Sequence, residues 1–219
     1  SGVHMAGTRG FEIGNILLGR CRELNVPVHL NTAVWGIYPD MTLAADQEEE
    51  PLVLHTQSII AATGAGENGF AFPGWTLPGV MGAGAAQTMV NFYRVRPGER
   101  AVIVGAGNVG LIVAYQLLQA GIEVSAVIEA LPFVGGYSVH ASKIRRMSIP
   151  IFTNHTILKA EGTDRVENCT IAAVDDDRLP KMGSEKKIDT DLICLAVGLS
   201  PAVELLRTIH VPLCYIAEL

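Results

Sequence analysis

The sequence predicts an α/β fold in which helices pack on a parallel sheet and an antiparallel β-meander forms one of the crossovers. Three observations predict it. Residues 101–130 follow the order apolar strand, helix, strand, which is typical of a parallel β-α-β unit. Three short strand-like runs within 149–190 are followed by a further apolar run at 191–201. About half of the residues (49%) are apolar and 17% are charged, which indicates a buried core.

The first part of the chain predicts a helix, several short strands and a second helix. Residues 9–24 carry apolar side chains at helical spacing, interrupted by Gly14 and Gly19. The other expected elements are strands at 26–30 and 32–39, a hairpin of 41–45 and 51–56 around the acidic tip 46–50, an apolar strand at 58–66 that ends in small residues, and a helix at 83–95.

The apolar pattern of the second part of the chain predicts the parallel sheet. Residues 101–105 are apolar on both faces, as expected for a strand buried between two layers. Residues 108–121 predict a helix that ends at Gly121. The remaining expected elements are a strand at 123–130, a helix at 137–148, three antiparallel strands at 149–162, 166–177 and 185–190, and a returning parallel strand at 191–201.

Three glycines form a G-x-G-x-x-G motif between the strand at 101–105 and the following helix. The first permits a tight turn, the second lets a diphosphate approach a backbone without a Cβ atom, and the third lets helix and strand pack closely. The helix N-terminus offers N–H groups and a partial positive charge to an anion. The motif predicts a Rossmann-like dinucleotide site, and the alternative is a glycine turn that only packs a helix on a sheet. The expected site residues are Gly105, Ala106, Gly107, Asn108, Val109 and Gly110.

A carboxylate completes this fingerprint. Glu129 ends the second strand, 24 residues after Gly105 (129 − 105). An acid at about this spacing accepts hydrogen bonds from the adenosine ribose hydroxyls and would repel a 2′-phosphate, which favours NAD over NADP. A basic cluster on the next expected helix is the one feature that favours NADP, because it could hold a 2′-phosphate. The alternative is that these residues simply form a solvated helix face. The cluster consists of His140, Lys143, Arg145 and Arg146.

Several stretches resemble a known family. "IIAATGA", "FPGWTLPGVMGAGAAQT", "RAVIVGAGNVG" and "ICLAVGLSP" occur in the order seen in FAD- and NAD(P)-dependent pyridine nucleotide-disulfide oxidoreductase-like flavoproteins. "PGWTLPGVMGAGAAQ" resembles the subgroup with the alpha subunits of sarcosine oxidase and proline dehydrogenase, opine oxidase and a hydrogen cyanide synthase subunit. The resemblance covers residues 10–205.

The resemblance implies two nested dinucleotide-binding domains with FAD and NAD as cofactors. Residues 1–96 would be the second portion of an FAD domain, 97–205 an NAD(P)-binding domain, and 206–219 the start of the return to the FAD domain. The first β-α-β unit of the FAD domain is absent from the sequence, so the resemblance implies an incomplete FAD domain and a fragment of a longer protein. It also places Ala62, Thr63 and Gly64 beside the flavin nucleotide, and Ala196, Val197 and Gly198 at the matching place in the NAD domain.

The function implied by the resemblance is electron transfer between NAD(H) and FAD within a heteromeric amine or amino-acid dehydrogenase or oxidase. This oxidoreductase would need other subunits as partners and a small-molecule substrate. No side chain stands out as a catalytic acid or base, because the cofactors carry this chemistry. The alternatives are a non-catalytic nucleotide-binding subunit and an assembly scaffold, each requiring a partner chain.

Composition and spacing exclude other classes. A net charge of −6 argues against nucleic-acid binding. No run of about 20 apolar residues predicts a membrane span, and no secretory signal is seen at the start. The histidines have no metal-ligand spacing, so no metal is expected. The four cysteines are scattered without a C-x-x-C pair, which indicates reduced thiols, a cytoplasmic location and no disulfide exchange.

Overall fold

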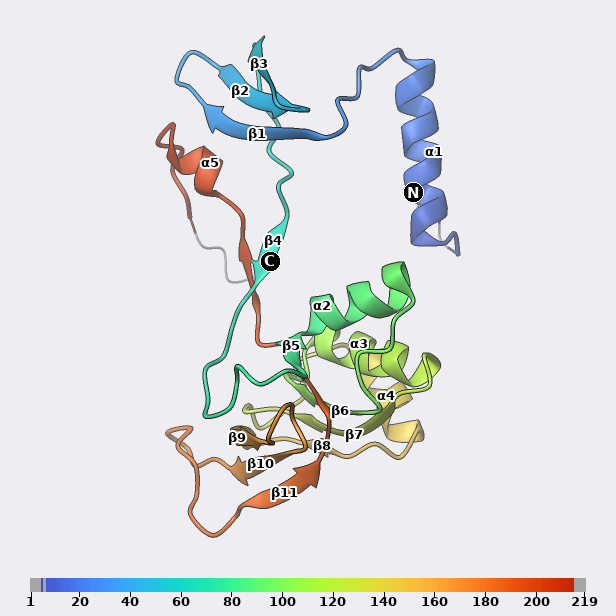
Figure 1. Ribbon diagram of the computed structural model, residues 1–219, viewed down its shortest axis with the longest axis vertical. Helices are drawn as coiled ribbons and strands as arrows, with labels where there is room; N and C mark the ends of the chain where they lie inside the picture. The colour runs from blue at the N-terminus through green and yellow to red at the C-terminus, as the bar shows by residue number, and fades with distance from the viewer. Residues whose placement is uncertain (1–4, 6, 215–219) are drawn as a thin grey trace. The chain divides into compact units, whose positions relative to one another are not determined.

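The computed structural model describes residue 5 and residues 7–214, and these form two compact units. The continuous unit runs from Gly64 to Pro201. The split unit combines the residues up to Thr63 with those from Ala202 onward (Figure 1). Residues 1–4 and 6 of the expected 1–96 domain, and 215–219 of the expected 206–219 segment, lie outside the described residues.

A five-stranded parallel sheet forms the centre of the continuous unit. In spatial order its strands are β5 (Val80–Gly82), β12 (Leu192–Leu195), β6 (Arg100–Val104), β7 (Glu123–Ile128) and β8 (Ile151–Phe152). All four neighbouring pairs are parallel. The α/β class is therefore confirmed, as are the strands expected at 101–105 and 123–130. Of the single parallel strand expected at 191–201, β12 is parallel as predicted, but Leu199–Pro201 form a separate strand that pairs antiparallel outside this sheet.

Helices pack on one face of this sheet and a β-meander packs on the other. The helices are α2 (Ala83–Thr88), α3 (Asn108–Gln119) and α4 (Ser138–Arg146). The antiparallel meander is β9 (His155–Glu161), β10 (Asn168–Ala173) and β11 (Lys186–Asp189). This arrangement is the predicted crossover, since the meander lies between β8 and the returning β12 in the chain.

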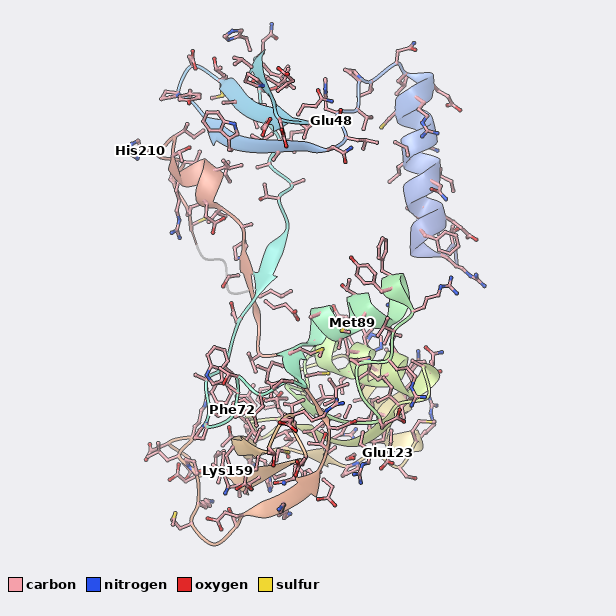
Figure 2. All side chains as sticks on the ribbon, viewed as in Figure 1. Glu48, Phe72, Met89, Glu123, Lys159 and His210 are labelled. Carbon is pink, nitrogen blue, oxygen red and sulfur yellow. The ribbon has the colours of Figure 1, made fainter. Side chains whose placement is uncertain are left out.

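Successive side chains of β6 point to opposite faces of the sheet and so contribute to both hydrophobic clusters of the core. Ala101 and Ile103 pack in the cluster on the helix side, while Val102 and Val104 pack in the cluster on the meander side. Phe72, labelled in Figure 2, is buried in the meander-side cluster. A strand with apolar residues on both faces is therefore buried between two layers, as the sequence predicts.

The split unit holds a smaller antiparallel sheet, ordered β1 (Thr32–Ile37), β2 (Thr42–Gln47) and β3 (Glu50–His55). It also contains α1 (Gly10–Glu23), which has no buried residue, and the single turn α5 (Glu204–Arg207). The expected helix at 9–24 and the expected hairpin are confirmed. A two-stranded antiparallel ribbon, β4 (Ala65–Glu67) with β13 (Leu199–Pro201), belongs to the continuous unit.

Two predicted strands are wrong. Residues 26–30 form no strand, and of the strand expected at 58–66 only β4 at its end is present. Ile60 is 95% exposed, and the segment 58–64 has no neighbouring strand among the described residues. An apolar run becomes a strand only where another strand satisfies its backbone groups, and sequence periodicity does not show that partner.

Two further predictions need correction in detail. The helix expected at 83–95 is α-helical only to Thr88, continues as the π-helix η1 (Met89–Tyr93) and ends at Arg94, whose φ is 57°. The strand expected at 149–162 divides into β8, which is parallel to β7, and β9, which is antiparallel to β10. Asn154, with φ of 52°, lies between them and allows the change of direction.

The continuous unit begins earlier than the expected domain start at residue 97. Residues 64–96 pack with the parallel sheet, because β5 pairs with β12 and α2 packs on its helix face. Which cofactor belongs to each domain stays a prediction.

A structural prediction concerns Asp191, whose carboxylate accepts hydrogen bonds from the backbone N–H groups of Glu99 (2.9 Å) and Arg100 (2.8 Å). Asp191→Ala leaves the turn before β6 without these acceptors. We expect a loss of about 2 kcal/mol in the free energy of unfolding. Urea denaturation measures it, and Asp176→Ala, at an exposed hairpin tip, is the matched control with an expected change below about 0.5 kcal/mol. Equal losses in the two variants would contradict this role.

Candidate functional site

The glycine loop, residues 105–110, connects β6 to α3. Gly105 has a φ of 109°, and a Cβ atom there would overlap the carbonyl oxygen of Ala196. A Cβ at Gly110 would overlap the carbonyl oxygen of Gly105. A Cβ at Gly107 would meet no atom within 4 Å. The first and third glycines are therefore required by the fold itself, whereas Gly107 faces open space at the N-terminus of a twelve-residue helix.

Glu129 lies directly after β7 and beside this loop. Its Oε2 accepts a hydrogen bond from the N–H of Ala106 (2.8 Å), and its Oε1 accepts one from the N–H of Leu131 (2.9 Å). Each carboxylate oxygen has a second lone-pair direction, so the group retains acceptor capacity. The residue expected to bind the ribose therefore also holds the loop in place.

One cavity of about 480 Å³ joins six of the predicted residues of the continuous unit. Its lining includes Gly105, Gly107, Glu129, Ala196, Val197 and Gly198. Ala196–Gly198 follow β12, whose carboxyl end lies beside that of β6 because the two strands are parallel. The cavity therefore lies at the carboxyl edge of the sheet, where α/β proteins bind their ligands.

The same cavity has lining residues that the sequence did not indicate. Phe70, His155, Thr156 and Arg178 contribute from the loop before β5, from β9 and from the hairpin between β10 and β11. The meander brings them to the glycine loop, since the backbone N–H of His155 donates to the carbonyl of Glu129 (3.0 Å). These lining residues could not be predicted from spacing along the chain, because their place depends on how β9 lies beside the end of β7.

The segment after Glu129 closes against the glycine loop. The N–H of Gly136 donates to the carbonyl of Ala106 (2.9 Å), and the N–H of Tyr137 donates to Oδ1 of Asn108 (2.7 Å). A Cβ at Gly136 would lie 3.0 Å from the carbonyl carbon of Gly107. Asn108 thus supports the loop with its side chain, and Gly135 lines the cavity.

The family's sequence profile, described as pyridine nucleotide-disulphide oxidoreductase, matches residues 5–215. The chain belongs to this family. It is 28% identical over 201 residues to hydrogen cyanide synthase subunit HcnB of Pseudomonas protegens, covering 84% of this chain and 43% of that one. It is 38% identical over 90 residues to an opine oxidase subunit of Agrobacterium tumefaciens, covering 40% and 18%. These are relatives of the kind that the sequence resemblance names.

The chain spans less than half the length of these curated relatives. Among solved structures, it is similar to thioredoxin reductase of T. acidophilum, with a TM-score of 0.71 and 21% identity. That match covers 94% of this chain and 64% of the reductase. At this identity the likeness establishes the fold: a Rossmann-type α/β architecture.

The residues expected beside the flavin lie apart from the cavity that contains Glu129. Ala62 and Thr63 belong to the split unit, and Gly64, with φ of 76°, begins the continuous unit. All three are exposed, and none of them lines the cavity of Glu129. The Thr63 hydroxyl donates to the carbonyl of Ala202, which ties the two chain segments of the split unit together. Their contact with FAD stays a prediction.

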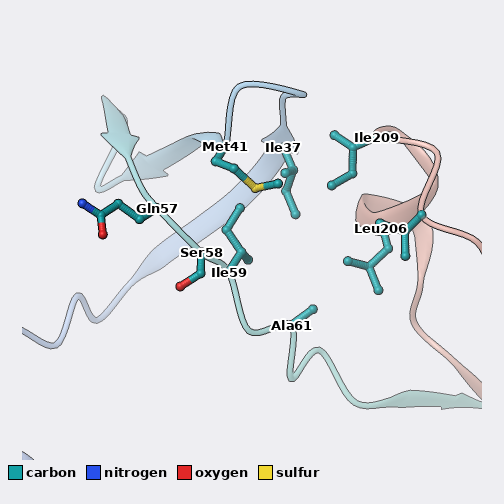
Figure 3. A pocket seen from close by; sticks show the side chains of 9 residues that line it. Ile37, Met41, Gln57, Ser58, Ile59, Ala61, Leu206 and Ile209 are labelled. Carbon is teal, nitrogen blue, oxygen red and sulfur yellow. The ribbon is translucent and has the colours of Figure 1, made fainter.

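The split unit has its own cavity, of about 490 Å³, shown in Figure 3. Apolar side chains such as Ile37, Met41 and Leu206 dominate its lining, and Gln57 and Ser58 are its polar members. None of its described lining residues is charged. These residues therefore offer a diphosphate no charged partner.

The basic cluster of α4 lies apart from Glu129. His140 and Lys143 line a groove between α3 and α4 rather than the cavity at the glycine loop. The Lys143 ammonium lies 5.1 Å from the centre of the Tyr115 ring, a cation–π contact. In the described part of the chain, no three His, Cys, Asp or Glu side chains gather to hold a metal ion, and no helix is long and apolar enough to cross a membrane.

Two cysteines are inert by burial. Burial raises the pKa of the Cys169 thiol to about 12, and burial together with the charge of Glu67 raises the pKa of Cys194 to about 12. At about pH 8 we expect a thiol reagent to modify Cys21 and Cys214 in the folded chain, and the two buried thiols only after denaturation. Rapid reaction of all four would contradict this burial.

The same pKa shift has a consequence for stability. In the unfolded chain these thiols ionise near their ordinary pKa of 9.0, whereas in the folded chain they stay protonated. Their contribution to the free energy of unfolding is therefore complete below about pH 9 and is lost as the pH rises towards 12.

Proposed function

We propose that the continuous unit binds NAD(H) along its glycine loop and exchanges electrons between it and a flavin, as part of a multi-subunit oxidoreductase acting on a small amine or amino acid. One observation carries the proposal. Gly107 leaves open space at the N-terminus of α3, and Glu129 lines the same cavity at the end of the adjacent strand. This is the pairing that a dinucleotide needs for its diphosphate and its adenosine ribose.

The residues present fit the cofactor. N–H groups at the start of α3 have no partner within the helix and can donate to phosphate oxygens, while Glu129 offers acceptor-only oxygens to the ribose hydroxyls. Ala196, Val197 and Gly198 are small enough to leave the cavity open above β12. When bound, the nicotinamide and the flavin supply the hydride chemistry, and this chain binds, orients and shields them.

Support for partner subunits comes from the relatives. HcnB and the opine oxidase relative are both named as subunits of their enzymes. We propose that the split unit contributes to an FAD domain, with Ala62–Gly64 beside the flavin nucleotide, and that the continuous unit, which contains most of the expected 97–205 domain, binds NAD. The sequence contains no C-x-x-C pair, so the electron transfer proposed here does not pass through a dithiol of this segment.

We propose NAD rather than NADP as the cofactor. Glu129 lies in the cavity and would repel a 2′-phosphate, whereas His140 and Lys143 line a different groove. Arg178 is the one basic side chain, histidine aside, among the described residues that line the cavity.

The test uses the full protein with its partner subunits. Anaerobic addition of NADH should bleach the visible absorption of the bound flavin, and NADPH at the same concentration should act much more slowly. NADH that binds without bleaching the flavin would instead favour a non-catalytic nucleotide-binding role. Complete failure to bind NADH would favour an assembly scaffold and overturn the proposal.

A further inference from the structure

A second cavity, of about 240 Å³, lies on the other side of the glycine loop. Its lining shares Gly107, Ala196 and Gly198 with the first cavity and adds Asn108, Val109, Leu199 and Glu67. The two cavities are therefore adjacent and meet at the loop. Among the described lining residues, the first contains one carboxylate, Glu129, and the second contains another, Glu67.

The Glu67 carboxylate is held in a defined place. It extends from β4, and its two oxygens accept hydrogen bonds from the N–H groups of Gly84 (2.6 Å) and Ala85 (3.3 Å). A Cβ at Gly82 would overlap Oε2 of Glu67, and one at Gly84 would lie 3.0 Å from its carboxyl carbon. The "GAG" at 82–84 thus makes room for this side chain.

The sheet order places the two carboxylates on opposite sides of β6. Glu129 follows β7, whereas Glu67 contacts the segment directly after β5, the strand that pairs with β12 on its side away from β6. A dinucleotide whose diphosphate lies at Gly107 and whose adenosine lies towards Glu129 must extend its other half over β12. That direction leads into the second cavity.

We propose that the second cavity receives the nicotinamide riboside half of the dinucleotide and that Glu67 is a recognition residue for it. The proposal rests on the function proposed above. An ionised carboxylate offers about four acceptor sites, and two are used on the backbone. The others suit the ribose hydroxyls and the carboxamide N–H of nicotinamide riboside. Its negative charge also favours the positively charged nicotinamide ring of NAD⁺ over the neutral ring of NADH.

The experiment compares ligands that share the adenosine half. Calorimetric titrations of the chain with ADP-ribose, NADH and NAD⁺ are made for the wild type, Glu67→Gln and Glu129→Ala. We expect Glu67→Gln to weaken the binding of NAD⁺ about tenfold, to weaken that of NADH by a smaller factor, and to weaken that of ADP-ribose by less than about twofold. Glu129→Ala should weaken all three ligands alike, since it acts on the shared half.

A second variant separates recognition from folding, because Glu67→Gln also changes a contact with α2. Leu199, which lines the cavity from β13 and is 53% exposed, is the cross-strand partner of Glu67 but makes none of the hydrogen bonds that hold its carboxylate, so a tryptophan there leaves the charge of Glu67 and its two donors in place. Leu199→Trp should fill the cavity and weaken NADH and NAD⁺ but not ADP-ribose.

The outcomes are distinguishable. If ADP-ribose binds and both variants bind NAD⁺ as the wild type does, the role of Glu67 is overturned while the proposed function stands. Equal weakening of all three ligands by Glu67→Gln, together with a lower melting temperature, would reduce Glu67 to a structural role. If the wild type binds none of the ligands, the proposed function fails first.

Discussion

Replacing Gly107 with alanine is expected to weaken NADH binding at least tenfold and to lower the stability of the fold by less than about 1 kcal/mol, the cost of a poorer helix cap. Gly107 caps the N-terminus of α3 with φ of −72°, a backbone angle that alanine adopts without strain. Its added methyl group would meet no protein atom within 4 Å, so it projects into the space that the diphosphate needs. A tenfold loss corresponds to about 1.4 kcal/mol. Nicotinamide fluorescence and thermal unfolding measure the two effects.

Gly110→Ala is the matched control for Gly107→Ala. It adds the same methyl group three residues later, where it would overlap the carbonyl oxygen of Gly105 and lie 3.2 Å from the Cβ of Ala196. We expect this variant to lose stability by about 1–3 kcal/mol, as overpacked positions do. Unchanged NADH affinity in Gly107→Ala would mean that the glycine loop only packs a helix on a sheet.

Glu129→Ala is expected to weaken NADH binding by about 1–3 kcal/mol, the cost of losing hydrogen bonds to a charged acceptor. The substitution removes the acceptors of the ribose hydroxyls, and it also frees the N–H groups of Ala106 and Leu131. Preference for NADH over NADPH should fall as well, because the charge that repels a 2′-phosphate is gone. Parallel titrations with the two dinucleotides measure both changes.

Glu123→Ala is the control for the loss of the Glu129 charge. Glu123 is exposed and begins β7, at the end of the strand opposite to Glu129 (Figure 2). The substitution removes one negative charge without touching the cavity, so NADH affinity should change less than about twofold. Equal losses in the two variants would indicate a long-range effect of charge and remove Glu129 from the site.

Sequence periodicity predicts the continuous unit well, because its signals are local. β6 is apolar on both faces, α3 ends beside Gly121 with φ of 78°, and the three glycines carry distinct steric requirements. Each of these properties depends on residues close together in the chain. The parallel order of the sheet follows, since a helix between two buried strands returns the chain in the same direction.

The remaining features depend on distant partners. Residues 58–64 look like a strand, yet they form none, because no described strand pairs with them, and all but Ile59 are exposed. Arg178 and His155 reach the first cavity only through the register of the meander. Glu67 reaches the second because β4 pairs with β13, where its partner Leu199 lies 132 residues later (199 − 67). No local spacing encodes such contacts.

The central claim, that the glycine loop holds the diphosphate of a nicotinamide dinucleotide, is tested most directly by backbone amide NMR of the isotope-labelled chain during titration with NADH. The amides of residues 105–110, followed by those of 129–131, should show the largest shifts and should saturate together. Saturable binding that leaves these amides unmoved and instead shifts residues such as Ile37 and Leu206, around the apolar cavity of the split unit, would contradict the claim.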